Sequence, residues 1–284
     1  MARPRLLALR EILVGLGYEN VDALILAGRV HVNGVRETRS GLRVREDARI
    51  EVQGDDERDR YVSRGAHKLL GAIEDFENTR DGDESAFARE SLANRICLDL
   101  GASHGGFSQV LLEAGAARVY AIDVARGILD FRVRRDERVI TLEKRNAREL
   151  QPDWLEPEDL ARAANADGAG DARGLFLTGD LSFISLCRIF DGLVGFLEAC
   201  GSGDANAPRP RPKIEAMLLI KPQFERPDAT DGGILTDDAV RDEIVAEVRD
   251  YARDVCGFRI RGVQPSRVAG AKGNREYFVW CERG

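Results

Sequence analysis

Apolar residues along positions 61–284 gather in short runs, which polar turns and amphipathic segments separate. Helical spacing of apolar residues marks 106–114, 183–199 and 237–255. Seven runs have the length and composition of buried strands, and they cover 96–100, 118–123, 138–143, 174–179, 214–220, 258–263 and 276–281. Strands that alternate with helices predict an α/β domain with a mostly parallel sheet covered on both faces. The last two runs follow each other without a helix, which predicts an antiparallel hairpin at one edge.

Residues 1–53 follow a different pattern and are predicted to form a separate α+β unit. Helical spacing of apolar residues covers 3–17 and 21–30. An alternating stretch with a central Asn-Gly pair, 30–35, is typical of a β-hairpin, and a closing strand follows it. Residues 54–60 are charged and lack periodicity, so they are predicted to be the linker to a second domain at 61–284.

Composition narrows the class of protein without identifying it. The chain has 284 residues, of which 43% are apolar, and no apolar run reaches the roughly 20 residues that span a bilayer. Its five cysteines form no C-x-x-C pair, so we expect no metal site, no disulfide framework and a cytoplasmic location. A net charge of −7 leaves nucleic-acid binding open, because a local basic surface can still bind phosphates. Two polar stretches, 151–173 and 201–213, are predicted to be solvated insertions.

The stretch "CLDLGASHGGF" is a candidate ligand-binding turn. A strand ending near Asp99 runs into a turn of small residues and then an amphipathic helix, an arrangement that lets backbone amides approach a ligand. The next strand ends in Asp123, which is suited to bind ribose hydroxyls. A tight β–α turn without a ligand is the alternative, because glycine-rich turns alone are weak signals.

Lysine is scarce in this chain, and its positions are informative. Only five of the 42 basic residues are lysines. Lys68 follows "SRGAH", and Lys221 directly follows the apolar run 214–220. Arginine does not lose its proton in proteins, whereas a partly buried lysine can act as a titratable amine. Asp180 and Glu276 adjoin other strand ends, where open α/β sheets bind ligands. An ordinary surface salt-bridge network is the alternative interpretation.

Five motifs together resemble one known family. "YVSRGAHKL", "LDLGASHGGF", "DLSFISL", "LIKPQFE" and "GNREYF" are similar, in order and context, to the TlyA family of bacterial rRNA methyltransferases, often labelled hemolysins. The resemblance implies a Rossmann-like class I fold that uses S-adenosylmethionine (SAM), of the FtsJ/RrmJ type. It also implies an N-terminal S4 RNA-binding domain, although the usual Ser-Arg before its second helix is missing here. The implied partner is ribosomal RNA or a ribosomal subunit, without membrane or metal.

The resemblance also implies roles for individual residues. Methyl transfer to a ribose 2′-hydroxyl would use Lys221 as the neutral base, with Lys68 beside it, Asp180 orienting the amine and Glu276 anchoring Lys68. The implied SAM-binding residues are Asp99, Gly101, Ala102, Ser103, Gly105, Gly106, Phe107, Asp123, Val124, Asn146 and Asp180. The implied RNA-binding residues are Arg5, Arg29, Asn33, Arg36, Arg39 and Arg64.

Rival assignments remain at the level of residues and of function. Glu225 is an alternative to Glu276, and His67 and His104 are alternative bases without an acidic partner in sequence. The stretch 226–240 is predicted to be a mobile substrate loop with Gly232 and Gly233 as hinges. Base methylation is disfavoured, because "DLSF" stands after the fourth strand, where an N-methyltransferase would have an Asp/Asn-Pro-Pro-aromatic motif. The rival functions are a non-catalytic ribosome assembly factor and a membrane-active hemolysin.

Overall fold

The chain forms two compact units, Met1–Tyr61 and Val62–Gly284, in a computed structural model. The structure describes residues 6–16, 18, 21–45, 48–52, 60–78, 86–164, 173–202 and 211–284. Arg5 and positions 54–59 of the predicted linker lie outside the described residues.

The first unit is a small α+β fold with two short sheets. One sheet pairs β1 with β4, and the other has the order β3-β2-β5. Its elements are β1 (Leu6–Ala8), α1 (Leu9–Gly15), α2 (Val21–Leu26), β2 (Val30–Val32), β3 (Val35–Glu37), β4 (Arg43–Arg45) and β5 (Ile50–Val52). Leu9, Leu13 and Ile25 form the centre of its core. The helix predicted over 3–17 is therefore too long, because Leu6–Ala8 pairs with β4 as a strand.

The predicted Asn-Gly hairpin is present between β2 and β3. Asn33 and Gly34 have positive φ values of 52° and 81°, as the two central residues of a type I′ turn require. Asn33 Oδ1 also accepts a hydrogen bond from the Arg49 backbone amide at 2.9 Å. The turn is thereby tied to the segment before β5, which pairs with the other side of β2.

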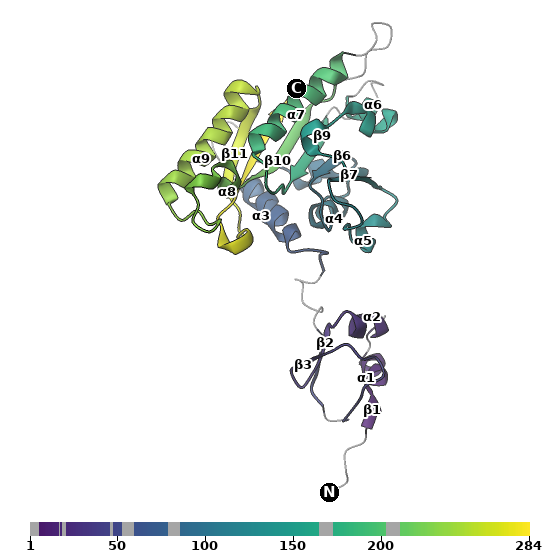
Figure 1. Ribbon diagram of the computed structural model, residues 1–284. Helices are drawn as coiled ribbons and strands as arrows, with labels where there is room; N and C mark the ends of the chain where they lie inside the picture. Colours follow the sequence, from purple (N-terminus) through teal and green to yellow (C-terminus); the bar gives the residue numbers. More distant parts are fainter. Residues whose placement is uncertain are drawn as a thin grey trace. The chain divides into compact units, whose positions relative to one another are not determined.

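The second unit is built on the predicted sheet, whose order is β11-β12-β10-β9-β6-β7-β8 (Figure 1). Five strands are parallel, and β12 is antiparallel to both of its neighbours. The strands are β6 (Ile96–Leu100), β7 (Arg118–Asp123), β8 (Val139–Glu143), β9 (Leu175–Gly179), β10 (Ile214–Ile220), β11 (Arg259–Pro265) and β12 (Tyr277–Arg283). The seven strands predicted from the sequence, and the edge hairpin, are confirmed.

Helices cover both faces of this sheet. They are α3 (Gly65–Asn78), α4 (Gly106–Glu113), α5 (Phe131–Arg134), α6 (Pro157–Ala163), α7 (Leu186–Gly201), α8 (Pro222–Glu225) and α9 (Asp238–Asp250), which continues into a π-turn at Tyr251–Val255. Even-numbered residues of β6 such as Leu98 pack with Phe190 of α7 and Val248 of α9. On the opposite face, Phe76 of α3 contacts Trp280, with ring centroids 5.5 Å apart. Burial of both faces explains why the central strands β6 and β9 are buried along their whole length.

The stretch 151–173 was predicted to be a solvated insertion, and this is wrong for its first half. Short helical turns and α6 occupy it up to residue 164, and Leu160 is buried in the main core. Asp159 is also buried, and it accepts hydrogen bonds from Tyr120 Oη at 2.7 Å and Arg118 Nε at 3.2 Å. A buried carboxylate with two donors anchors this segment to β7. Residues 165–172 and 203–210 lie outside the described residues.

Candidate active site

The strand register brings three of the singled-out residues to one edge of the sheet. Ile220 at the end of β10 pairs with Tyr277 at the start of β12. Lys221 follows Ile220 and Glu276 precedes Tyr277, so both residues meet at this edge. Asp180 follows the neighbouring parallel strand β9 and reaches the same place. Ligands bind at the carboxyl ends of the strands in open α/β sheets, which makes this edge the candidate site.

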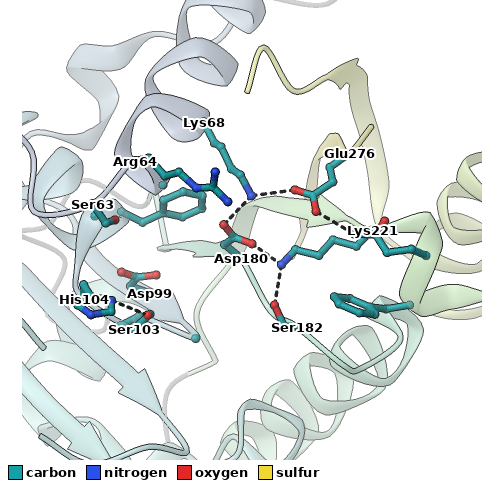
Figure 2. A pocket seen from close by; sticks show the side chains of 17 residues that line it. Ser63, Arg64, Lys68, Asp99, Ser103, His104, Asp180, Ser182, Lys221 and Glu276 are labelled. Carbon is teal, nitrogen blue, oxygen red and sulfur yellow. Dashed lines mark hydrogen bonds and ion pairs between the residues drawn. The ribbon is translucent and has the colours of Figure 1, made fainter. Parts of the chain in front are cut away.

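The four residues form one continuous chain of ion pairs, which Figure 2 shows. Lys68, from α3, donates hydrogen bonds to Asp180 Oδ2 at 2.9 Å and to Glu276 Oε2 at 2.8 Å. Lys221 Nζ lies 2.6 Å from Asp180 Oδ1. Lys68, Lys221 and Glu276 are exposed by only 6%, 7% and 2%. Because charges are rarely buried unless paired, this arrangement is a built site and not the surface network considered as the alternative.

The charges of the two lysines control the ionisation of Asp180. Burial opposes ionisation of this carboxyl, but the nearby ammonium groups of Lys221 and Lys68 outweigh burial and hold its pKa below the ordinary value. Burial likewise opposes the charge on Lys68, and the carboxylates of Asp180 and Glu276 outweigh it, so the pKa of Lys68 is raised. At neutral pH the centre of the chain is therefore a fixed ammonium between two carboxylates.

Further residues hold the ends of this chain. Gln223 Nε2 donates to Glu276 Oε1 at 2.9 Å, and Ser182 Oγ accepts from Lys221 Nζ at 2.9 Å. Gly270 packs against Glu276 so closely that a Cβ there would lie 2.0 Å from Oε1. Ser182 and Gln223 were not predicted from the sequence. Each stands two residues after a predicted catalytic residue, and this spacing is the feature of the sequence that could have identified them as site residues.

Two cavities adjoin this chain and share part of their walls. The first has a volume of about 390 Å³ and is lined by all four residues of the chain together with Asp99, Phe107 and Arg64. The second, of about 470 Å³, is lined by Asp123, Val124 and Asn146 among others. Gly101, Ser103, Asp180 and Ser182 line both cavities. A ligand could extend from one cavity to the other past Asp180.

The predicted cofactor turn occupies the floor of the first cavity. Asp99 Oδ2 accepts hydrogen bonds from the backbone amide and the hydroxyl of Ser108 at 2.8 and 2.7 Å, which fixes the start of α4. Burial raises the pKa of the Asp99 carboxyl to about 7, although the hydrogen bonds from Ser108 oppose this shift. Gly105 does not line either cavity in the part of the chain that the structure describes. It has φ of 91°, and a Cβ there would lie 2.8 Å from Leu129 Cδ1.

Asp123 connects the turn to the next strand. Its Oδ2 accepts from the Ser103 amide and its Oδ1 from the Ala125 amide, both at 2.8 Å. Each oxygen keeps a second lone pair that can accept a ribose hydroxyl. Asn146 lies nearby, and its side chain accepts from the Arg148 amide at 3.2 Å. These contacts orient the polar groups that line the second cavity.

An aromatic pair stands where the two cavities meet. Phe183 is 89% exposed and has φ of 61°, which is unusual for a residue with a side chain. Its ring lies 4.8 Å from that of Phe224, between centroids. Phe183 lines the second cavity and Phe224 the first. A large apolar ring that is held exposed beside a cavity is typical of a ligand contact. Phe183 was predicted to begin the helix, which instead starts at Leu186.

The rival site residues lie elsewhere or make other contacts. Glu225 accepts hydrogen bonds from Ser185 Oγ at 2.5 Å and the Leu186 amide at 2.6 Å, so it fixes the start of α7. His104 Nδ1 is 3.2 Å from Ser103 Oγ at the rim of the first cavity. His67 is not among the lining residues of that cavity, as far as the described chain extends. Only Glu276 of the two candidate glutamates joins the ion-pair chain.

The predicted RNA-binding residues of the first unit make contacts within that unit. Arg36 donates from Nε to Gly28 O at 3.0 Å and from Nη2 to Ala27 O at 3.2 Å, at the end of α2. Arg39 forms an ion pair with Glu37 at 2.8 Å. Asn33 belongs to the hairpin turn described above. These contacts give Asn33, Arg36 and Arg39 structural roles, and their contact with RNA stays a prediction, as does that of Arg29.

The predicted substrate loop is a hydrogen-bonded turn. Gly232 and Gly233 have positive φ values of 55° and 83°. Lys272 Nζ donates to Gly232 O at 2.6 Å, and Asn274 Nδ2 donates to Gly233 O at 2.9 Å. Asn274 Oδ1 accepts from the Leu235 amide at 3.0 Å. The turn is therefore attached to the segment that leads into Glu276.

Fold and site together define a class of protein. A seven-stranded sheet with one antiparallel strand, a glycine-rich turn after β6 and an acid after β7 are the features of a Rossmann-like methyltransferase. The sequence profile of the FtsJ-like methyltransferase family matches residues 61–283. The chain belongs to the TlyA family of FtsJ-like methyltransferases, as the resemblance of its motifs implied.

Relatives of this chain carry two kinds of name. It is 38% identical, over 90% of its length and 81% of the relative's, to the 16S/23S rRNA (cytidine-2′-O)-methyltransferase TlyA of Mycobacterium tuberculosis. It is 34% identical to Hemolysin A of Brachyspira hyodysenteriae, over 90% of both chains. A solved structure of a hemolysin-named protein from Lactococcus lactis superposes with a TM-score of 0.61 at 31% identity, covering 79% of this chain and 89% of that one.

Two structural findings bear on the rival functions and on metal binding. Within the described part of the chain, every helix is too short or too polar to cross a membrane. In the same residues, no group of three or more His, Cys, Asp or Glu side chains is placed to hold a metal ion.

Proposed function

We propose that this protein transfers the methyl group of SAM to a ribose 2′-hydroxyl of ribosomal RNA, with cytidine as the modified nucleoside. The observation that carries the proposal is the buried chain Lys68–Asp180–Lys221 with Glu276, placed where the two cavities meet. Its relative in M. tuberculosis is named for this reaction on 16S and 23S rRNA. A ribose hydroxyl is a weak nucleophile, so a positioned base and a precise approach supply the rate.

The residues of the two cavities fit SAM as the cofactor. SAM supplies a methyl group on a positively charged sulfur. The carboxylate of Asp123 would hold the ribose hydroxyls, and Val124 and Asn146 line the same cavity, which would take the adenine. Asp99 and the turn Gly101–Ser103 line the cavity that would take the amino-acid end, and Asp180 lies between the two parts. A carboxylate near the sulfonium would stabilise its charge, and the contacts of its two oxygens with Lys68 and Lys221 would keep Asp180 from competing for the methyl group.

Lys221 is the base in this mechanism. The ribose 2′-oxygen gains the methyl group while its proton passes to the neutral amine of Lys221. The carbon–sulfur bond breaks at the same time, and its electron pair stays on sulfur. Asp180 holds the amine in place through its 2.6 Å contact, and the resulting ammonium is stabilised by the same carboxylate. Lys68, kept protonated between Asp180 and Glu276, is a fixed cation that can hold the acceptor oxygen.

The acceptor nucleotide would be bound by aromatic stacking and by cations. Phe183 and Phe224 offer a ring surface for the nucleobase beside the cavity mouth. Arg64 lines the same cavity and is suited to a phosphate of the target strand. The first unit is proposed to be an S4-like RNA-binding domain that uses Arg29, Asn33, Arg36 and Arg39, with Arg5 before it.

A labelling experiment tests this proposal. The purified protein is incubated with SAM labelled in the methyl group and with 30S subunits, 50S subunits or free rRNA. Digestion of the RNA then locates the label, because a 2′-O-methyl group protects the adjacent phosphodiester bond from alkali. Label on a 2′-O-methylcytidine supports the proposal. SAM binding without label on any RNA would favour the non-catalytic assembly factor, and label on a base would contradict the proposed acceptor.

A further inference from the structure

Ser182 makes the one described hydrogen bond of the Lys221 amine. Its Oγ accepts from Lys221 Nζ at 2.9 Å, while Asp180 Oδ1 lies 2.6 Å from the same nitrogen (Figure 2). Ser182 is exposed and lines both cavities, so its hydroxyl faces the place where methyl donor and acceptor would meet. The base therefore has one ion-pair partner, Asp180, and one described hydrogen-bond acceptor, Ser182.

These two contacts determine where the reactive electron pair of the base points. A neutral amine nitrogen is tetrahedral, with one bond to carbon, two N–H bonds and one lone pair. When one N–H is fixed on Ser182 Oγ and the ion pair keeps the nitrogen beside Asp180, the lone pair is confined to the remaining directions. With Asp180 alone, rotation about the Cε–Nζ bond exchanges the second N–H with the lone pair. The base would then point its lone pair correctly only part of the time.

Most carboxylate oxygens near Lys221 are engaged by other donors. Asp180 Oδ2 and Glu276 Oε2 are bound by Lys68, and Glu276 Oε1 is bound by Gln223. The ring of Phe224 also lies near, with its centroid 5.6 Å from Nζ. A ring face at this distance cannot accept a directed hydrogen bond as well as an oxygen does. Loss of the Ser182 hydroxyl should therefore leave the second N–H without a directional partner.

The loop that carries Ser182 is held firmly at its far end. Ser185 caps α7 by accepting from the Cys187 amide at 3.2 Å. Glu225, four residues after Lys221, accepts from Ser185 Oγ and from the Leu186 amide at 2.5 and 2.6 Å. The segment after β9 is in this way tied to the segment after β10. The 2.9 Å contact between Ser182 and Lys221 thus joins two segments whose relative position is already fixed.

We propose that Ser182 is a positioning residue that aims the lone pair of Lys221 at the acceptor hydroxyl. The inference rests on the proposed function, since it concerns the base of that reaction. The inference adds the hydroxyl of Ser182 to the four charged residues of the ion-pair chain and gives this hydroxyl a role in the methyl-transfer step. Ser182 does not take up the proton, and it does not replace Asp180 as the partner of the charged amine.

The test compares Ser182→Ala and Ser182→Thr with the wild type. Threonine keeps the hydroxyl at this exposed position, and Ser202→Ala, at the exposed end of α7, is the control for a lost serine hydroxyl. Single-turnover methyl transfer to ribosomal subunits is measured with saturating SAM. SAM affinity and melting temperature are measured on each variant without RNA. These two readouts report on the cofactor site and the fold independently of the chemical step.

We expect Ser182→Ala to slow the single-turnover rate by about 10- to 100-fold, as loss of a hydrogen bond to a charged or reacting group does. Its KM values and SAM affinity should stay within about twofold of wild type, and threonine should restore most of the rate. A wild-type rate in Ser182→Ala would overturn the inference, as would a loss that appears only in KM or is not restored by threonine. Absence of transfer by the wild type would instead refute the proposed function, and the inference with it.

Discussion

Replacement of Lys68 by methionine is the most informative change to the ion-pair chain. The ammonium of Lys68 is the only cation that contacts both Asp180 and Glu276 among the described residues, at 2.9 and 2.8 Å. Methionine has a similar length and no charge. Asp180 keeps Lys221 as a partner after this change, whereas Glu276, which is 2% exposed, keeps only the amide of Gln223. The cost of the substitution should therefore come mainly from Glu276.

The size of this effect follows from the distances and the burial. Two unit charges 2.8 Å apart attract by about 6 kcal/mol at an effective dielectric constant of about 20. Removal of the lysine also removes the desolvation cost of its ammonium, which returns several kcal/mol. We expect a net loss of about 3–5 kcal/mol in the free energy of unfolding at pH 7, as for other broken buried pairs. For a domain of this size the melting temperature should fall by roughly 10 °C.

The assay is denaturant unfolding of the wild type, Lys68→Met, Glu276→Gln and the double variant. The double variant removes both charges, so it should recover at least half of the stability that Lys68→Met loses. The pH dependence has a definite sign. The pKa of Asp180 is lower in the folded protein than in the unfolded chain, so its carboxylate stabilises the fold at any pH above the unfolded value. This contribution disappears as the pH falls through the pKa of the folded state. The deficit of Lys68→Met should therefore persist at pH 4 and shrink only at lower pH, as the pH falls through the lowered pKa of Asp180.

Two results would refute this reasoning. A solvated surface lysine contributes little to stability, so a loss below about 1 kcal/mol in Lys68→Met would contradict the buried ion-pair chain. A double variant that is no more stable than Lys68→Met would show that the lost stability comes from packing and not from an uncompensated carboxylate.

Three further predictions concern single positions around the cavities. Gly270→Ala should reduce methyl transfer by about 100-fold, because its Cβ would displace the Glu276 carboxylate; a wild-type rate would contradict that close contact. Asp99→Asn should stabilise the SAM-free protein by a few kcal/mol at pH 8 and by little at pH 4. The pKa of Asp99 is raised from 3.8 to about 7, so the wild type loses stability as the pH rises between those two values. Equal melting curves of the two proteins at pH 8 would contradict this prediction. Phe183→Ala should weaken RNA binding by about 1–3 kcal/mol, and unchanged RNA binding would exclude stacking.

The sheet was predictable from the sequence because its pattern is unambiguous. Runs such as 214–220 are apolar on both faces and are separated by helical segments, and that pattern leads to a parallel sheet. The positions of Lys221 and Asp180 at strand ends followed directly from it. The short strand β1 was missed, because three residues ahead of a helix carry no periodicity of their own. Helix α6 was missed since its surroundings are polar and its burial depends on the Asp159 contacts.

The neutral residues of the site could not be predicted in the same way. Asp180 and Lys221 are conspicuous as charged residues after apolar strands, but serine and glutamine are common in loops. Ser182 and Gln223 gain their roles only when strand register brings β9, β10 and β12 to one edge. The same holds for the choice between Glu225 and Glu276. The first caps a helix and the second joins the lysines, although each adjoins an aromatic residue in the sequence.

The central claim is that Lys221 removes the proton of the ribose hydroxyl, and Lys221→Arg tests it most directly. Arginine keeps the positive charge and the ion pair with Asp180, but its guanidinium cannot act as a base. We would measure single-turnover methyl transfer to ribosomal subunits by the wild type, Lys221→Arg and Lys221→Ala, with SAM binding as the control for the fold. The account predicts that both variants bind SAM and that both lose transfer by at least about 100-fold. Transfer by Lys221→Arg at close to the wild-type rate would show that a positive charge suffices and that Lys221 is not the base.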